Sequence, residues 1–198
     1  MDKGSYTFQA LSSKYEDFRG PAFTIKVDGT QLNSAELPIA TLEVEQCSDG
    51  SASGCHFSVE SLYDFAKWIN NLAKTVQVGA KLEILAGYVK QELIFYGYVD
   101  EVSMEYQRGA PPRLTVTGID GFGYLMSCQE PIYGGKKKPQ QVVEDILTKA
   151  VSAGYAKKKT VGSLTGFEVP VVKEKLDDFK YLRLLSQRYC MSLFSVAG

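Results

Sequence analysis

Apolar and polar residues alternate along much of the segment between positions 21 and 125, and this alternation predicts β-strands. Phe23, Ile25 and Val27 are separated by polar residues, which is typical of a half-buried strand. Asp28-Gly29 follows directly and favours a two-residue hairpin turn, because a type I′ turn requires positive φ. Further strands are predicted over residues 37–46, 55–59, 94–99 and 114–120 and around Leu82 and Ile84.

The period of the pattern changes between residues 61 and 76. Apolar residues recur there at helical spacing, and Ser61 with Asp64 forms a possible capping box. The residues of the stripe are Leu62, Phe65, Ile69, Leu72, Ala73 and Val76. The segment therefore predicts an amphipathic helix that covers or plugs the sheet.

The composition changes again at residues 130–139, where Gly, Pro and Lys indicate a linker or exposed loop. Pro139 suits the first turn of a helix, which an apolar stripe extends to a terminator at Gly154. A short strand is expected at 167–172, followed by a last helix capped by Asp177 or Asp178. Residues 191–196 predict a final strand, which either pairs with an earlier strand or marks the chain as a fragment of a longer protein.

These elements predict a mainly β, α+β fold with three parts. Residues 1–20 have no clear period and are expected to form an N-terminal arm. Residues 21–130 are expected to form a small β-barrel with an attached helix. Residues 131–198 are expected to form an α+β segment.

Composition and charge exclude several function classes. The chain has 198 residues, of which 44% are hydrophobic and 23% are charged, as in globular proteins. Its net charge of −1 provides no overall basic field for nucleic acid, so the lysine runs at 136–138 and 157–159 are interpreted as solvated loops. No apolar run is long enough to span a bilayer, and the N-terminus lacks the apolar core of a signal peptide. We expect synthesis in the cytoplasm.

The cysteines and the single histidine do not form a recognisable site. No Cys-x-x-Cys pair is present, so a zinc site of common spacing is not expected. Cys47 and Cys55 could meet on neighbouring strands, although buried free thiols are the more frequent arrangement in a cytosolic protein. His56 follows Cys55, but adjacent strand residues point to opposite faces, which argues against a catalytic Cys–His pair.

Carboxylates are numerous but show no catalytic spacing. Those considered are Glu43, Glu45, Asp100, Glu101, Asp120, Asp177 and Asp178. Most are explained as solvated strand faces or helix caps, and Asp120 is expected to cap the turn at residues 121–124. Motifs typical of nucleotide binding, metalloproteases or α/β-hydrolases are absent from the sequence. We therefore expect a binding or structural protein, not an enzyme, with no catalytic residues, cofactor or metal.

Five segments occur in an order and spacing that resemble one family. They are Pro21–Ile25 with Asp28-Gly29, Gly79–Ile84 leading to Gly87-Tyr88, Phe95–Val99, Leu114–Asp120 with Leu125, and Asp178–Leu185 with Arg188–Met191. They resemble the late-control protein D family of contractile-tail phages. These are baseplate hub proteins, similar to the N-terminal part of type VI secretion spike proteins. The resemblance covers the chain from about Pro21 to its end.

This resemblance implies a structural hub, in which three copies form a ring that joins the tail tube protein to a trimeric spike protein. The particle would be a phage tail, a prophage tail, a bacteriocin or a secretion device. Family members continue into a second barrel, so residues 131–198 would be its truncated start. The contact residues between copies are not predicted.

Two alternatives from other classes remain open. The first is a tail-associated hydrolase of the cell wall or of glycans, suggested only by the number of acidic residues. The second is a monomeric ligand-binding β-barrel, which would require a preformed interior pocket.

Overall fold

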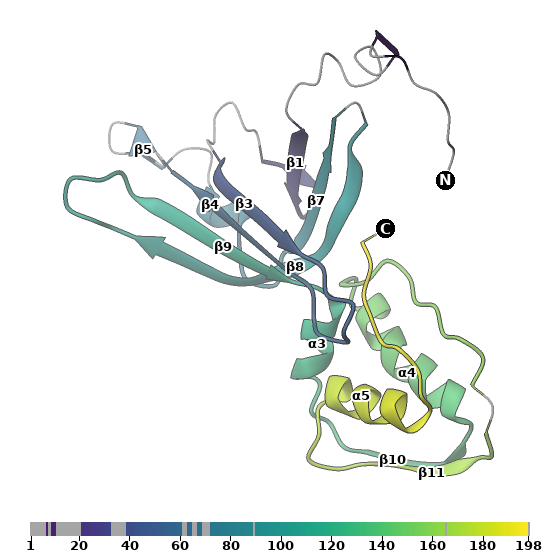
Figure 1. Cartoon of the computed structure of the whole chain (residues 1–198). Helices are drawn as coiled ribbons and strands as arrows, with labels where there is room; N and C mark the ends of the chain where they lie inside the picture. The colour runs from purple at the N-terminus through teal and green to yellow at the C-terminus, as the bar shows by residue number, and fades with distance from the viewer. Residues whose placement is uncertain are drawn as a thin grey trace.

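The computed structural model describes residues 7, 9–10, 21–32, 39–60, 63–64, 67–68, 72–88, 90–164 and 166–197. Most of the arm predicted at residues 1–20 lies outside these described residues. The chain has a mainly β, α+β fold, as predicted, with a large antiparallel sheet followed by a helical region (residues 121–197) (Figure 1).

The sheet has seven antiparallel strands in the order β2-β1-β7-β8-β9-β4-β3. Their bounds are Ala22–Val27 for β1, Thr30–Gln31 for β2, Ile39–Glu45 for β3, Gly54–Val59 for β4, Lys81–Gly87 for β7, Glu92–Glu105 for β8 and Arg113–Ile119 for β9. Among the described pairings, β2 and β3 are the edge strands, so a closed barrel is not seen, although the arrangement is compatible with one.

The predicted hairpin between β1 and β2 is confirmed. Asp28 and Gly29 both have positive φ, at 47° and 78°, as a type I′ turn requires. Asp28 also accepts a hydrogen bond of 2.8 Å from the backbone nitrogen of Lys81, which joins the turn to the start of β7.

Alternation along the strands places apolar side chains in one core. Cys55, Phe57 and Val59 of β4 are all buried, as predicted, while His56 between them is exposed. The core side chains with no more than 2% exposure are Ile25, Val27, Phe57, Val59, Leu82, Ile84, Phe95, Val99 and Val116. They come from five strands, so burial of one face stabilises the whole sheet.

The helix predicted over residues 61–76 is wrong at residues 63–64 and 67–68 and confirmed only at its C-terminal end. Tyr63–Asp64 (β5) pairs with Lys67–Trp68 (β6), and a helix is present only at Leu72–Thr75 (α2). Residues 61–62, 65–66 and 69–71 lie outside the described residues. Aromatic residues fit strands well, and a short apolar segment can satisfy both periods, which explains the error.

The linker predicted at residues 130–139 is also wrong, because Ile132–Lys137 is a strand (β10) that pairs with Val169–Lys173 (β11). The pairing shifts register between Gly134 and Lys136, so a bulge accommodates the glycine-rich sequence.

Three helices complete the helical region: Gly121–Ser127 (α3), Pro139–Ser152 (α4) and Asp178–Arg188 (α5). The helices predicted from Pro139 and from Asp177 or Asp178 are confirmed, with Asp177 as the N-cap of α5. Gly154 has a φ of 78° just after α4, as predicted for a terminator. None of the described helices is long and apolar enough to cross a membrane.

The final strand predicted at residues 191–196 is not formed. This segment runs back from α5 towards the sheet without regular structure (Figure 1). Leu193 packs against the second hydrophobic core, which consists of Phe122, Leu125, Val142, Ile146, Ala150, Val171, Phe179, Leu182 and Leu185. Packing on helices therefore replaces the strand pairing that the apolar pattern suggested.

Candidate functional site

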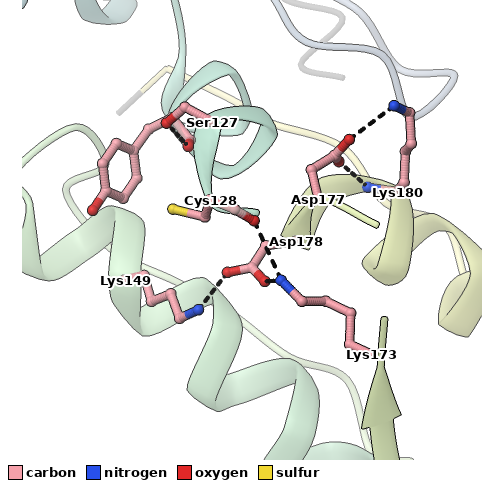
Figure 2. Close-up of polar contacts among 8 residues, drawn as sticks. Ser127, Cys128, Lys149, Lys173, Asp177, Asp178 and Lys180 are labelled. Carbon is pink, nitrogen blue, oxygen red and sulfur yellow. Dashed lines mark hydrogen bonds and ion pairs between the residues drawn. The ribbon is translucent and has the colours of Figure 1, made fainter. Parts of the chain in front are cut away.

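A buried polar cluster of the helical region surrounds Asp178 (Figure 2). The side chains of Asp178 and Lys173 are fully buried and form an ion pair through Nζ and Oδ1. Lys149, whose side chain is 34% exposed, places its Nζ 2.6 Å from Oδ2 of the same carboxylate. One buried carboxylate therefore faces two ammonium groups.

Four elements position this cluster. Asp178 is the first residue of α5, Lys149 lies in the last turn of α4, and Lys173 ends β11. The carbonyl oxygen of Cys128, directly after α3, accepts hydrogen bonds from the Asp178 nitrogen at 3.0 Å and from Lys173 Nζ at 3.3 Å. Because each group of the cluster belongs to a different element, these contacts fix the relative positions of α3, α4, α5 and β11.

Asp177 beside the cluster has a separate role as the helix cap. Its Oδ1 accepts a hydrogen bond of 2.7 Å from the Lys180 nitrogen, and Lys180 Nζ lies 2.9 Å from Oδ2. Burial opposes ionisation, but the hydrogen bonds and charge of Lys180 outweigh it and hold the pKa of Asp177 below its ordinary value. Asp177 is thus an ionised cap, as its sequence position predicted.

Asp120 joins the sheet to the helical region. It is buried, its Oδ1 accepts from the Phe122 nitrogen at 2.9 Å, and its Oδ2 accepts from the Ser53 nitrogen at 3.0 Å. Burial raises the pKa of Asp120 above its ordinary value, although these hydrogen bonds counteract the shift. The predicted cap of α3 is confirmed, and the bond to Ser53 adds a connection across 67 positions of sequence.

Tyrosine side chains form a second connection between the two regions. The Tyr155 hydroxyl donates to the carbonyl of Gly79 at 3.2 Å, and the Tyr96 hydroxyl donates to the carbonyl of Gly154 at 2.9 Å. The rings of Tyr98 and Tyr155 pack with centroids 4.4 Å apart. Each of these contacts crosses from the sheet to the segment after α4, so the junction is tied at several points.

The cysteines and His56 do not form a catalytic pair. All four cysteines are free thiols, including Cys47 and Cys55, whose pairing the sequence left open. Cys55 is buried, and loss of solvation raises the pKa of its thiol to about 12, far from the range of an activated nucleophile. His56 is exposed on the opposite face of β4, as the strand geometry predicted.

The other predicted carboxylates lie apart from the buried cluster. Glu43, Glu45, Asp100 and Glu101 are exposed on the sheet. In the part of the chain that the structure describes, no three His, Cys, Asp or Glu side chains are close enough to hold a metal ion. The carboxylates therefore divide into solvated strand residues and buried structural residues.

The sequence interpretation missed Lys173, Lys149 and Ser53. A signal for Lys173 was present, because the period of two in β11 places it on the same buried face as Val171. A lysine at an inward strand position requires a counter-ion, and Asp178 provides it five residues later. Ser53 gave no signal, since it contributes through its backbone.

A cavity of about 210 Å³ lies outside the sheet core. Phe122, Leu125 and Leu147 line it, together with Phe194 of the C-terminal segment. The inner face of the sheet, in contrast, is filled by the side chains of its own core. The described sheet thus has a packed interior.

Comparisons with solved structures identify the fold as that of phage tail proteins. The 43 kDa tail protein of prophage MuSo2 from Shewanella oneidensis matches 89% of this chain with a TM-score of 0.66 and 11% identity. A tail protein from Neisseria meningitidis MC58 matches 85% with a TM-score of 0.55 and 14% identity. The type VI secretion component c3393 of Escherichia coli, itself structurally similar to the bacteriophage T4 tail proteins gp27 and gp5, matches 86% with a TM-score of 0.54 and 14% identity.

The chain spans about half the length of these solved proteins, covering 53%, 45% and 47% of them respectively. No protein-family model matches the sequence, and a search of curated proteins also finds no match. Three-dimensional similarity therefore carries the comparison where sequence similarity does not.

Proposed function

We propose that this chain is a structural hub protein of a contractile tail or related injection particle, which joins the tail tube to the central spike. The observation that carries the proposal is the match of 85–89% of the chain to two tail proteins and a type VI secretion component. The order of segments resembling the late-control protein D family supports the same role. The protein would be made in the cytoplasm and then incorporated into the particle.

Hydrogen bonds between the sheet and the helical region support a structural role. A hub must hold its contact surfaces in fixed relative positions, and here Asp120, Tyr96 and Tyr155 connect the sheet to the helical region. We further propose a sheet domain at residues 21–130 and an α+β domain at residues 131–198. Two hydrophobic cores support a division into two parts, although Phe122 and Leu125 of the first range pack in the second core.

The role we propose is not enzymatic. A glycan hydrolase needs carboxylates that can reach a substrate. Asp120, Asp177 and Asp178 instead form helix-capping hydrogen bonds and ion pairs within the chain. The packed sheet interior also favours a structural protein over a ligand-binding barrel.

Light scattering of the chain alone, and then with candidate tail tube and spike proteins, tests the proposal. We expect a species of three times the 21.9 kDa chain mass, either alone or in a complex that contains three spike chains. A chain that remains monomeric and binds neither protein would contradict the hub role. A small molecule retained by that monomer would instead favour the ligand-binding alternative.

A further inference from the structure

The two parts of the chain carry opposite charge. Residues 1–130 contain seventeen Asp and Glu against ten Lys and Arg, whereas residues 131–198 contain twelve Lys and Arg against six Asp and Glu. The net charge of −1 for the whole chain therefore combines an acidic part of −7 with a basic part of +6. Such a separation favours contact between unlike parts of different molecules.

The exposed side of α5 carries part of this positive charge. Its exposed residues follow helical spacing and form what we call the basic stripe: Lys180, Arg183, Leu184, Gln187 and Arg188. Phe179, Leu182 and Leu185 occupy the opposite, buried side of the helix. Leu184, at 51% exposure, gives the stripe an apolar centre between its cations. Exposed arginines around an apolar side chain are typical of protein contact surfaces.

The outer face of the sheet concentrates the negative charge. The strand register places Glu43, His56, Thr117 and Glu101 side by side across β3, β4, β9 and β8. Glu45 lies two residues along β3 from Glu43 and therefore on the same face. We call these five residues the acidic face. Glu43 and His56 also line a hollow of about 510 Å³ on this face, together with Arg113, which is paired with Glu60.

Within one molecule, the basic stripe and the acidic face form no ion pair with each other in the described part of the chain. Among the described residues, Lys180 pairs with Asp177, but no ion pair joins Arg183 or Arg188 to any acid of the sheet. Glu43, Glu45 and Glu101 likewise have no ion-pair partner in the described part of the chain. Arg183 does act on one carboxylate of its own chain, because its charge adds to the hydrogen bonds from Ser51 that lower the pKa of Asp49. Both surfaces are nevertheless charged and exposed.

From this arrangement we infer that the basic stripe of one copy docks on the acidic face of a second copy. The inference rests on the proposed function, because it names the surfaces through which copies of the hub would associate. Since the two surfaces differ, the contact is heterologous and can repeat from copy to copy until a ring closes. Charge complementarity sets the orientation, and Leu184 supplies the apolar contact.

Charge-reversal variants test this contact. One variant carries Arg183→Glu with Arg188→Glu, a second carries Glu43→Lys with Glu101→Lys, and a third combines all four changes. The control, Lys136→Glu with Lys158→Glu, reverses two exposed cations outside the stripe. Sedimentation equilibrium at low and high salt measures self-association. All substituted side chains are exposed, so the urea midpoint of each variant should remain close to that of the wild type.

We expect each of the first two variants to weaken self-association roughly tenfold or more, as for other close charge pairs across interfaces. The combined variant should regain the wild-type affinity to within about threefold, because its charges again attract. A mixture of the first two variants should associate more tightly than either variant does alone, because each reversed surface then meets an opposite charge. The control should behave like the wild type.

A wild type that stays monomeric, or a combined variant that fails to regain association, would overturn the inference. Binding of a double-stranded DNA probe to the stripe without self-association would also overturn it, by assigning the stripe to a polyanion. Parallel binding of the tube and spike proteins separates the two proposals. If the chain binds these proteins but the charge reversals leave self-association unchanged, the hub role stands and this contact is wrong. If the reversals weaken self-association but the chain binds neither protein, the hub role is wrong.

Discussion

The sheet and the helical region keep their polar groups in different places. In the sheet, alternation places apolar side chains inside and charged residues such as Glu43, Glu45 and Glu101 outside. In the helical region, Asp178 and Lys173 are fully buried as an ion pair beneath a smaller apolar core. The sheet therefore depends mainly on burial of apolar area, while the helical region also depends on complete pairing of buried charge.

Removal of the Asp178 carboxylate should produce the largest loss of stability. The change Asp178→Ala leaves Lys173 buried without its counter-ion, which typically costs about 3–5 kcal/mol. Urea unfolding followed by circular dichroism measures this loss. Hydrogen exchange should show that α4, α5 and β10–β11 lose protection before the sheet does.

A surface ion pair provides the control for this prediction. Lys137 and Asp145 are 2.7 Å apart, with side chains 46% and 60% exposed, so Asp145→Ala should cost about 0–1 kcal/mol. The joint change Lys173→Met with Asp178→Leu should recover most of the loss, because it removes both buried charges. Equal losses for Asp178→Ala and Asp145→Ala would show that burial of the pair is not decisive.

The corresponding weak point of the sheet is steric. A Cβ at Gly97 in β8 would overlap the backbone carbonyl of Ile119, and a backbone atom cannot move aside as a side chain can. We expect Gly97→Ala to cost about 1–3 kcal/mol or more in urea unfolding. Gly135→Ala is the control, since nothing lies within 4 Å of a Cβ there. An unchanged midpoint for Gly97→Ala would mean that β8 and β9 can separate at little cost.

The junction between the two regions should respond to pH through Asp120. Asp120→Asn replaces one of two accepting oxygens by a donor, so a buried backbone N–H loses its partner at a cost of about 1–3 kcal/mol. The raised pKa of folded Asp120 adds a pH-dependent part. The folded state holds this proton more tightly than the unfolded chain, whose Asp pKa is about 3.9. The stabilisation that protonated Asp120 gives to the folded state is therefore complete below about pH 3.9 and is lost as pH rises through the raised pKa.

The free energy of unfolding of the wild type, relative to Asp120→Asn, should accordingly fall as pH rises through this window. Asp177→Asn provides a control of opposite sign, because the pKa of Asp177 is lowered by Lys180 against the effect of burial. Its contribution is present above about pH 3.9 and is lost as pH falls through the lowered pKa. Urea titrations at a series of pH values measure both differences, and slopes of the same sign would contradict the assignment.

The strands of the sheet could be predicted because the alternation of apolar and polar residues within each strand indicates which face is buried. Cys55, Phe57 and Val59 show this face without any knowledge of their neighbours, and Asp28-Gly29 specifies its turn by φ alone. The segment at 61–76 satisfied two periods at once, so its described strands were mistaken for a helix. A local hydrophobic pattern predicts the secondary structure where it fits only the helical period or only the strand period.

The junction and the buried cluster depend on pairs that are distant in sequence or made by backbone atoms. Ser53 and Asp120 meet through a main-chain nitrogen, which no side-chain pattern reveals. Gly134 and Gly135 indicated a loop, but pairing with β11 and a bulge made the segment a strand. Asp178 could be predicted as a helix-terminal residue, whereas its ion pair with Lys173 required the packing of β11 against α5.

The smallest expected effect concerns the exposed edge of the junction. Lys157 lies 3.1 Å from Glu83 of β7 and 4.8 Å from the centre of the Tyr96 ring, but its side chain is 43% exposed. Solvent screening reduces such a pair, so Lys157→Met should cost at most about 1 kcal/mol, and less at high salt. Lys158→Met is the control, since Lys158 is exposed and has no ion-pair partner among the described residues. Urea midpoints at two salt concentrations measure the difference. A larger, salt-independent loss would show that the Lys157 stem contributes by packing against Tyr96, and the junction would then resemble the sheet more than the buried cluster.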